Sequence, residues 1–319
     1  MQEFDLIRNY FSKLAKNNKS ALDLNDDVFF DRNKGLVISV DSYNEGIHFP
    51  NFINPSLVIK KILRSSISDL ICKGVKPKLY FISGSGNKIN FSKKKLKEIS
   101  NSLSEEQKRY KIHLCGGDTT YSKKLNFSVT VVGFSKKIIF RNNANVYDDI
   151  YVTGNLGDSY VGLQMLNKKI KSKKNEFDYF SRKYYMPDIQ IRLAEKLFGF
   201  CNSSIDISDG LFADLEKLIN KQNLNYQIFL QKIPVSNFLQ SLIKKSKLSK
   251  IDLVSNGDDY QILFTATKKK SRIIKMISKK LRVKISKIGQ ILPSFQKSHI
   301  IHEKGYIIRP KSKGYIHQF

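Results

Sequence analysis

The sequence is poor in cysteine and in acidic residues, and it has no long apolar run. Its three cysteines, Cys72, Cys115 and Cys201, lie far apart and form no CxxC pair, which argues against a disulfide framework and against a structural zinc site. No segment approaches the roughly twenty apolar residues that a membrane helix needs. The first residues include Glu3 and Asp5 and lack the apolar stretch of a secretory signal. We therefore expect a reduced, cytoplasmic protein with no membrane partner.

Two familiar nucleotide-binding signatures are also absent. There is no P-loop sequence GxxxxGK followed by Ser or Thr, and no HRD and DFG pair of a protein kinase. Gly154 and Gly157 form half of a GxGxxG pattern, which is weak evidence for a dinucleotide site. Any chemistry that uses ATP must therefore rely on another scaffold.

Lysine and arginine outnumber the acids by 56 to 28, which gives a net charge of +28. Such a charge fits a nucleic-acid partner, and this remains an alternative from a different functional class. However, the basic residues are dispersed along the chain in short runs, and no aromatic residues alternate with them as a base-stacking surface would require. We therefore favour a lysine-rich solvated surface, whose field would also attract nucleotide phosphates.

A length of 319 residues with 41% hydrophobic content predicts two domains with real cores. Apolar spacing predicts helices over 4–14, 55–73, 92–109 and 188–198. It also predicts a helix through Val161, Leu163 and Leu166, and one that starts at Ser208-Asp209-Gly210. It predicts strands over 36–41, 127–134, 150–153, 204–207, 261–266 and 283–291. The lysine-rich residues 167–174 are expected to form a loop. The mixture indicates an α/β (α+β) fold, with domains over 1–146 and 147–319 that meet near the polar, turn-rich stretch 141–149.

The few acids gather in short motifs flanked by Gly or Ser. These motifs are Asp26-Asp27, Ser39-Val40-Asp41, Ser68-Asp69, Gly116-Gly117-Asp118 and Asp206-Ile207-Ser208-Asp209-Gly210. Carboxylates at strand ends and helix starts hold hard cations, and paired glycines let the backbone approach a phosphate. Each motif alone could instead be a turn or a helix cap. Together they predict Mg²⁺ and a phosphorylated substrate.

The ordered set of motifs resembles that of the thiamine-monophosphate kinases, a family of the aminoimidazole-ribonucleotide-synthetase-like superfamily. The resemblance runs from Glu3 to Tyr315 and so covers nearly the whole chain. It rests on the acidic motifs above, and also on Glu45-Gly46-Ile47-His48-Phe49, Tyr151-Val152-Thr153-Gly154 and Gly257-Asp258-Asp259-Tyr260. Any one motif is weak evidence, but their joint order and spacing are specific.

The resemblance implies that the protein uses ATP to convert thiamine monophosphate into thiamine diphosphate by direct in-line transfer, with no catalytic side chain beyond the binding residues. It implies Mg²⁺ ligands at Asp27, Ser39, Val40, Asp41, Asp69, Asp118, Asp206 and Asp209. It implies nucleotide contacts at Gly117, Asp118, Arg141 and Ser208, and substrate contacts at His48, Asp258 and Tyr315. It also implies a homodimer in which the sheets of the N-terminal domains form a shared barrel. Another ATP-dependent enzyme of the superfamily is the alternative within this class.

Three positions depart from the family pattern. Asn25 replaces a glycine but tolerates the same left-handed backbone. Val40 replaces a threonine, so a hydroxyl beside the predicted metal ligands is lost. Asp258 is one methylene shorter than the usual glutamate.

Overall fold

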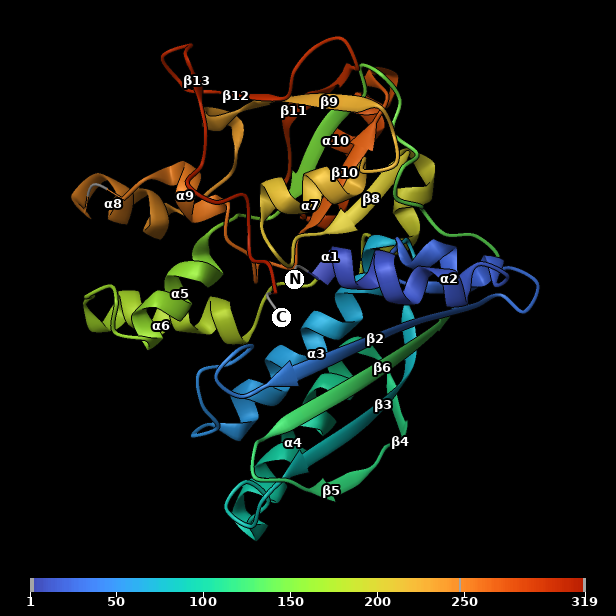
Figure 1. Ribbon diagram of the computed structural model, residues 1–319. Helices are drawn as coiled ribbons and strands as arrows, with labels where there is room; N and C mark the ends of the chain where they lie inside the picture. The colour runs from blue at the N-terminus through green and yellow to red at the C-terminus, as the bar shows by residue number, and fades with distance from the viewer. Residues whose placement is uncertain (1–2, 247, 318–319) are drawn as a thin grey trace.

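The computed structural model describes residues 3–246 and 248–317, and within them the chain builds two β-sheets (Figure 1). The first sheet ends with β6 (Asn126–Phe134), and the second begins with β7 (Asp149–Thr153). The mixed α/β class is as predicted. We propose that the domain boundary lies in the segment between these two strands. None of the described helices is long and apolar enough to cross a membrane.

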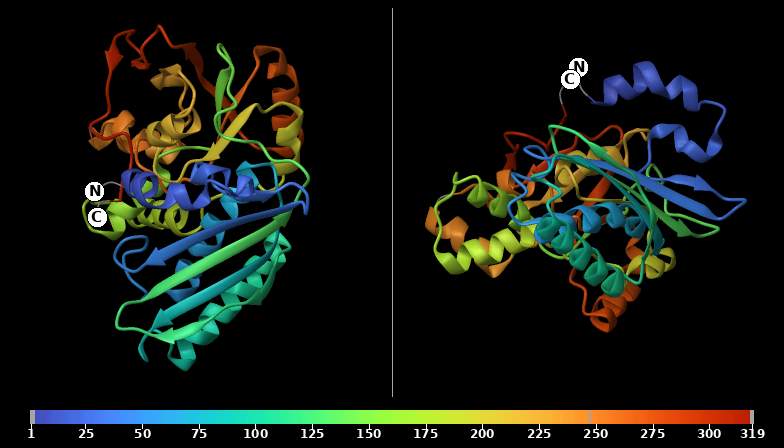
Figure 2. Two further views of the ribbon diagram at one scale, coloured as in Figure 1. Left: turned by 45° about the vertical axis from the view of Figure 1, so that its right-hand side comes forward. Right: turned by 90° about the horizontal axis from the view of Figure 1, so that it is seen from below.

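The N-terminal sheet has the strand order β1-β2-β6-β3-β4, and β5 also pairs with β3. Its other strands are β1 (Phe29–Asp31), β2 (Leu36–Asn44), β3 (Pro77–Gly86), β4 (His113–Gly116) and β5 (Thr119–Tyr121). Helices α3 (Pro55–Cys72) and α4 (Lys93–Tyr110) cover one face of this sheet (Figure 2). Both helices were expected from the apolar spacing of the sequence.

Helix α3 has clear local signals at both ends. The side chain of Asn54 accepts a hydrogen bond from the backbone N–H of Leu57, and Pro55 occupies the first turn, where its missing N–H costs nothing. Gly74 adopts a φ of +81° just after the helix and ends it. The apolar side chains of Ile59, Leu63 and others are fully buried, so the helix is fixed against the sheet.

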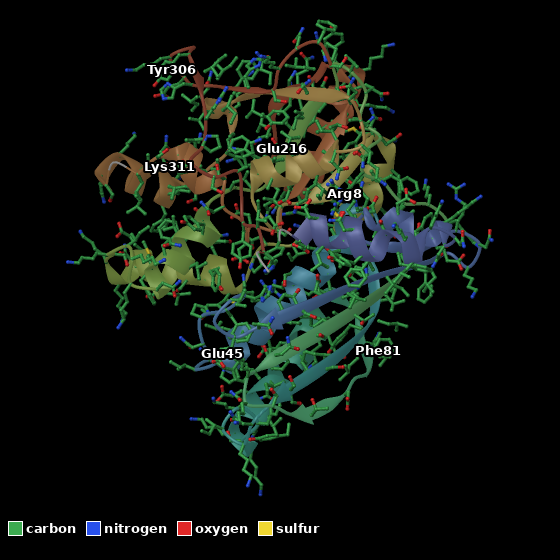
Figure 3. All side chains as sticks on the ribbon, in the orientation of Figure 1. Arg8, Glu45, Phe81, Glu216, Tyr306 and Lys311 are labelled. Carbon is green, nitrogen blue, oxygen red and sulfur yellow. The ribbon has the colours of Figure 1, made fainter. Side chains whose placement is uncertain are left out.

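The opposite face of the N-terminal sheet carries exposed apolar side chains. Residues at even positions of β2 point to this face, and the register places Val40 opposite Thr130, which in turn lies opposite Phe81. Val40 is 67% exposed and Phe134 is 58% exposed; Phe81 is labelled in Figure 3. An apolar sheet face of this kind is uncommon on a monomer and marks an interaction surface.

The N-terminal helical segment precedes this sheet. It comprises α1 (Glu3–Leu6), a π-helical turn (η1, Ile7–Phe11) and α2 (Ser12–Ala15), which confirms the helix predicted over 4–14. A short 3₁₀ segment, η2 (Lys19–Leu24), leads to β1. The apolar residues Tyr10 and Leu14 of this helical segment are exposed rather than packed.

The C-terminal sheet has the order β13-β12-β9-β11-β7-β10-β8 and is antiparallel except where β12 meets β9. Its remaining strands are β8 (Ser203–Asp206), β9 (Leu224–Phe229), β10 (Ile262–Ala266), β11 (Ile285–Pro293), β12 (His299–Ile301) and β13 (Ile307–Ile308). Helix α7 (Leu211–Leu218) packs its apolar side chains into a core with this sheet. Tyr151 and Phe264 lie in another core, which they share with α3 and which therefore joins the two sheets.

Four further helices form a side lobe around a small core. They are α5 (Asp158–Leu166), α6 (Lys174–Tyr185), α8 (Asn237–Ser246) and α9 (Lys250–Val254). Helix α10 (Ser271–Leu281) packs Ile274 against the core shared by the two sheets.

The helix predicted over 188–198 is wrong for most of its length. The chain forms only a short 3₁₀ turn, η3 (Ala194–Gly199), after an irregular stretch that follows Pro187. Leu193, Ala194 and Leu197 are fully buried, so one tight turn brings the apolar side chains into the core. Here tertiary packing overrides the helical spacing of the sequence.

Candidate active site

A cavity of about 390 Å³ collects most of the predicted site residues. Its lining includes Asp27, Val40, Asp41, His48, Asp69, Arg141, Asp206, Ser208, Asp209, Asp258 and Tyr315. These residues come from segments that are far apart in the sequence, as the hypothesis of a single convergent site requires.

Two of the acids lie on the first sheet and on the long helix α3 that covers it. Asp41 lies on β2, and Asp69 lies in the last turn of α3, next to the covered face of the sheet. The Tyr43 hydroxyl donates a hydrogen bond to Asp41 Oδ2 at 3.2 Å and lies 2.7 Å from Ser66 Oγ. A strand and a rigid helix therefore fix these carboxylates in place.

The C-terminal domain contributes two loops and the tail, which are tied together by backbone contacts. Asp258 N–H donates to the carbonyl of Ser208 at 2.9 Å, and Tyr315 N–H donates to the carbonyl of Asp209 at 2.9 Å. A Cβ added to Gly257 would lie 1.8 Å from the Ser208 carbonyl oxygen, so only glycine allows this approach. Asp258 itself has a φ of +69°, a strained conformation of the kind found at functional sites.

Burial raises the pKa of the acids Asp41, Asp69 and Asp206, which form one end of the cavity, called here the acidic end. Burial, with repulsion from Asp41 and Asp206, holds the pKa of Asp69 well above its ordinary value. Burial raises the pKa of Asp41, and it raises the pKa of Asp206 to about 6. Asp206 is buried, and its Oδ2 has no hydrogen-bond partner among the described residues. Clustered carboxylate oxygens with an unpartnered lone pair fit a hard divalent cation such as Mg²⁺.

Three basic side chains surround this acidic end: Arg141, which was predicted as a nucleotide contact, and two lysines that were not predicted. Lys73 Nζ lies 2.6 Å from both Asp26 Oδ1 and Asp27 Oδ2, and Arg141 forms an ion pair with Asp27. Lys217 forms ion pairs with Asp209 and with Asp214, its neighbour on α7. Nothing in the lysine-rich sequence distinguished these two lysines from the many solvent-exposed ones.

The other end of the cavity is aromatic. The ring centroids of Tyr43 and His48 lie 5.7 Å apart, those of His48 and His317 lie 5.5 Å apart, and those of Tyr315 and His317 lie 4.9 Å apart. Burial, helped by the charge of His317, lowers the pKa of His48 to about 4, so its ring is neutral at physiological pH. Its Nδ1 accepts the backbone N–H of Asn44 at 3.0 Å. This end can hold a flat heteroaromatic ligand.

Asp258 lies beside the aromatic end and is paired with Lys61. The fully buried Nζ of Lys61 lies 2.5 Å from Asp258 Oδ1 and 3.9 Å from the ring centroid of Tyr184. Lys61 lies on α3, so this ion pair links the two domains across the site. Lys61 was not among the predicted site residues, although it lies on the same predicted helix as Asp69.

Three of the predicted residues do not line the cavity. Ser39 is buried behind Val40, and its hydroxyl donates to the Ser66 carbonyl at 3.4 Å. Gly117 and Asp118 lie on the exposed β4–β5 connection, where Asp118 N–H donates to Ser83 Oγ at 3.1 Å. The β4–β5 connection lies beside β3, and β6 lies between β3 and β2 in the sheet. With neighbouring strands about 4.8 Å apart, about 14 Å separates this connection from β2.

A larger cavity of about 840 Å³ lies between the N-terminal helical segment and α7. Its lining includes the basic residues Arg8, Lys13, Lys16, Lys221 and Lys313, and it shares Tyr315 with the first cavity. It contains none of the acids of the predicted metal set. We therefore assign the chemistry to the smaller cavity.

Comparison with known proteins first defines the class. Residues 24–135 match the family described as AIR synthase related protein, N-terminal domain. The chain is also similar over its whole length to the solved structure described as AaThiL complexed with AMPPCP and TMP. The two share a TM-score of 0.84 and 26% identity, and the match covers 99% of this chain and 97% of the other. The fold is thus that of the AIR-synthase-related proteins.

Curated relatives then define the family. The chain is 34% identical over 322 residues to the thiamine-monophosphate kinase of Buchnera aphidicola subsp. Acyrthosiphon pisum, with 99% of this chain and 98% of that protein covered. It is 30% identical over 297 residues to the thiamine-monophosphate kinase of Haemophilus influenzae, with 91% and 89% covered. The chain belongs to the thiamine-monophosphate kinase family and is therefore an enzyme, which confirms the resemblance seen in the sequence.

Proposed function

We propose that this protein transfers the γ-phosphoryl group of ATP to thiamine monophosphate in the presence of Mg²⁺. The observation that carries the proposal is the convergence of Asp41, Asp69, Asp206 and Asp209 in one cavity that also has an aromatic end. The names of the relatives and the ligands AMPPCP, an ATP analogue, and TMP in the similar solved structure support it.

The acidic end suits the reaction because both reactants are polyanions. Two unit charges 4 Å apart repel by about 4 kcal/mol at an effective dielectric constant near 20. Mg²⁺ held by Asp41, Asp69, Asp206 and Asp209 would neutralise the phosphate charges. Arg141 and Ser208 line the same cavity and are suited to bind nucleotide phosphates.

The aromatic end suits the acceptor. Thiamine carries two flat heteroaromatic rings, one of them cationic, and aromatic faces attract such rings. Tyr315 and His48 supply such faces at the mouth of the cavity. Asp258 is held by Lys61, so its shorter side chain is fixed in position although it lacks the methylene of the family glutamate.

The transfer needs no general base from the protein. An oxygen of the acceptor phosphate attacks the γ-phosphorus in line, and the bond from that phosphorus to the β–γ bridging oxygen breaks. The bonding electron pair leaves with ADP, and thiamine diphosphate forms. The residues of this chain bind and align the two phosphates, which is the main task in phosphoryl transfer.

The direct test is incubation of the purified protein with ATP, Mg²⁺ and thiamine monophosphate, with thiamine diphosphate measured by chromatography. We expect product only when all three are present. Thiamine without its phosphate serves as the control acceptor and should give no thiamine diphosphate. A well-folded protein that makes none from thiamine monophosphate would contradict the proposal. We also propose a cytoplasmic location, in keeping with the three free cysteines.

We further propose that two copies pair through the open face of the N-terminal sheet, as the resemblance implies. The exposed apolar residues Val40, Phe81 and Phe134 lie on this face. Gly117 and Asp118 lie about 14 Å from β2 in the same chain, by the strand spacing given above. In a paired barrel the partner copy can supply these residues to the nucleotide, which reconciles their predicted role with their position outside the cavity.

Mixed dimers test this arrangement. The variants Asp69→Asn and Asp118→Asn should each be inactive alone. If Asp118 acts on the partner's cavity, co-expression gives mixed dimers with one intact site, and about one quarter of wild-type activity returns. If both residues act within one chain, no mixed dimer has an intact site and activity does not return. Size-exclusion chromatography with light scattering reports the pairing itself.

A further inference from the structure

Lys73 occupies an unusual place at the end of α3. Its side chain is fully buried, and its ammonium group contacts three oxygens: Asp26 Oδ1 at 2.6 Å, Asp27 Oδ2 at 2.6 Å and the Ser204 carbonyl at 2.8 Å. An ammonium group has three donors, so each is satisfied. The arrangement resembles the oxygen environment of a bound cation.

Asp26 and Asp27 are fully engaged by the protein's own groups. Asp26 Oδ2 accepts the backbone N–H of Arg141 at 3.0 Å, and the Arg141 guanidinium forms an ion pair with Asp27. By contrast, Asp206 Oδ2 has no hydrogen-bond partner among the described residues, and the Asp41 carboxylate is bound by the neutral hydroxyls of Tyr43 and Ser66. Asp26 and Asp27 are thus compensated by buried cations, whereas Asp41 and Asp206 have no such positive partner.

Three side chains near the Lys73 ammonium group could together bind a metal ion. Atoms of Asp27, Cys72 and Asp206 all lie within 4.8 Å of one another, close enough to hold one metal ion. Lys73 is the neighbour of Cys72 in the sequence and contacts Asp27 directly. Its ammonium therefore competes with any ion for this position.

We infer that Lys73 is a built-in cation that takes the place of a divalent ion at Asp26 and Asp27, so that metal ions are held by Asp41, Asp69, Asp206 and Asp209. The inference deepens the proposed function and rests on it for the presence of a metal-dependent site. Lys73 is a positioning residue, because it acts through the two carboxylates and does not line the cavity.

The test counts Mn²⁺ ions by the electron paramagnetic resonance signal of the free ion, without nucleotide. We expect Lys73→Met to bind one more Mn²⁺ than the wild type, or to bind Mn²⁺ at least tenfold more tightly. Lys73→Arg keeps the positive charge and should match the wild type. Lys76→Met removes a nearby exposed lysine that pairs with Glu195, and it should also match the wild type.

Equal number and equal affinity in Lys73→Met and the wild type would overturn the inference. If Lys73→Met does not fold, a second comparison uses the double variant Asp26→Asn/Lys73→Met, which removes one charge of each sign, and the single variant Asp26→Asn. The double variant should bind Mn²⁺ more tightly than the single one. Equal binding by the two would refute the role of Lys73. Because Mn²⁺ binding is read without substrate, an inactive wild type in the kinase assay would count against the proposed function and leave this measurement standing.

Discussion

The two ends of the cavity differ in burial and in origin. The acidic end is built from β2, α3 and the start of α7, and its carboxylates are held close together away from water. The aromatic end is built partly from the C-terminal tail, and Tyr315 is 50% exposed. Burying like charges is costly, so it persists where chemistry needs them, whereas an open aromatic surface serves recognition. We therefore expect changes at the first end to affect turnover and changes at the second to affect binding.

The largest effect should come from Asp69→Asn. Loss of one carboxylate from the metal-binding group should lower kcat by about 10³-fold, the scale for removing one stabilising group of a preorganised site. The same change removes repulsion from Asp41 and Asp206, so without metal the Tm should rise. We expect a rise of about 1–2 °C, the shift that about 1 kcal/mol gives in a protein of this size.

Steady-state kinetics and a thermal melt measure both effects. Asp188→Asn, the same chemical change at an exposed acid paired with Lys183, is the matched control and should alter neither. Near-normal turnover in Asp69→Asn would contradict the assignment of turnover to the acidic end of the cavity.

A middle-sized effect is expected from Tyr315→Ala. Loss of one aromatic contact of about 1.4 kcal/mol should raise KM for thiamine monophosphate about tenfold. KM for ATP and kcat should change much less, because the phosphates bind at the other end. Tyr306→Ala is the control: Tyr306 stacks on His302 beside β13, away from the cavity (Figure 3). An equal rise in both KM values would show that Tyr315 does not belong to a separate acceptor end.

The smallest effect concerns pH. The folded-state pKa of Asp206, about 6, lies above its ordinary value of 3.8, because burial penalises the charged form. Ionising it therefore costs more in the folded protein, and metal-free stability should fall as pH rises from about 4 to about 6. Mg²⁺ binds the ionised acids, so it should raise Tm more at about pH 7.5 than at about pH 5. Melting curves with and without Mg²⁺ measure this, and an equal rise at both pH values would argue against Mg²⁺ at the acidic end.

Periodicity predicted the main elements of the fold well where one face is buried. The helix expected over 55–73 is observed as Pro55–Cys72, and the strand expected over 36–41 lies within Leu36–Asn44. Strand β3 was not predicted because its Ser-Gly-Ser-Gly end resembles a turn, yet neighbouring strands on both sides supply its hydrogen bonds. Helix α10 was not predicted either, because its many lysines hide a narrow apolar stripe around Ile274.

The site could be predicted in part because its acids sit in recognisable local motifs. Asp206 lies at the end of β8 and Asp69 near the end of α3, so local signals located them, whereas Asp41 lies inside β2, which continues past the predicted end to Asn44. Lys61 and Lys73 have no such signal: Lys61 lies on α3 and Lys73 directly follows it, among many other lysines, and only packing buries their ammonium groups. The metal and ligand roles of all these residues stay predictions.

The sequence by itself determined the fold class, the family and the residues of the acidic motifs, because hydrophobic spacing and motif order are local properties of the chain. The tertiary structure decided which charges meet. It paired Lys73 with Asp26 and Asp27, paired Lys61 with Asp258, and left Asp118 outside the cavity. The physical reason is that the cost of a charge depends on its burial and its partners, and both arise only when distant segments pack together.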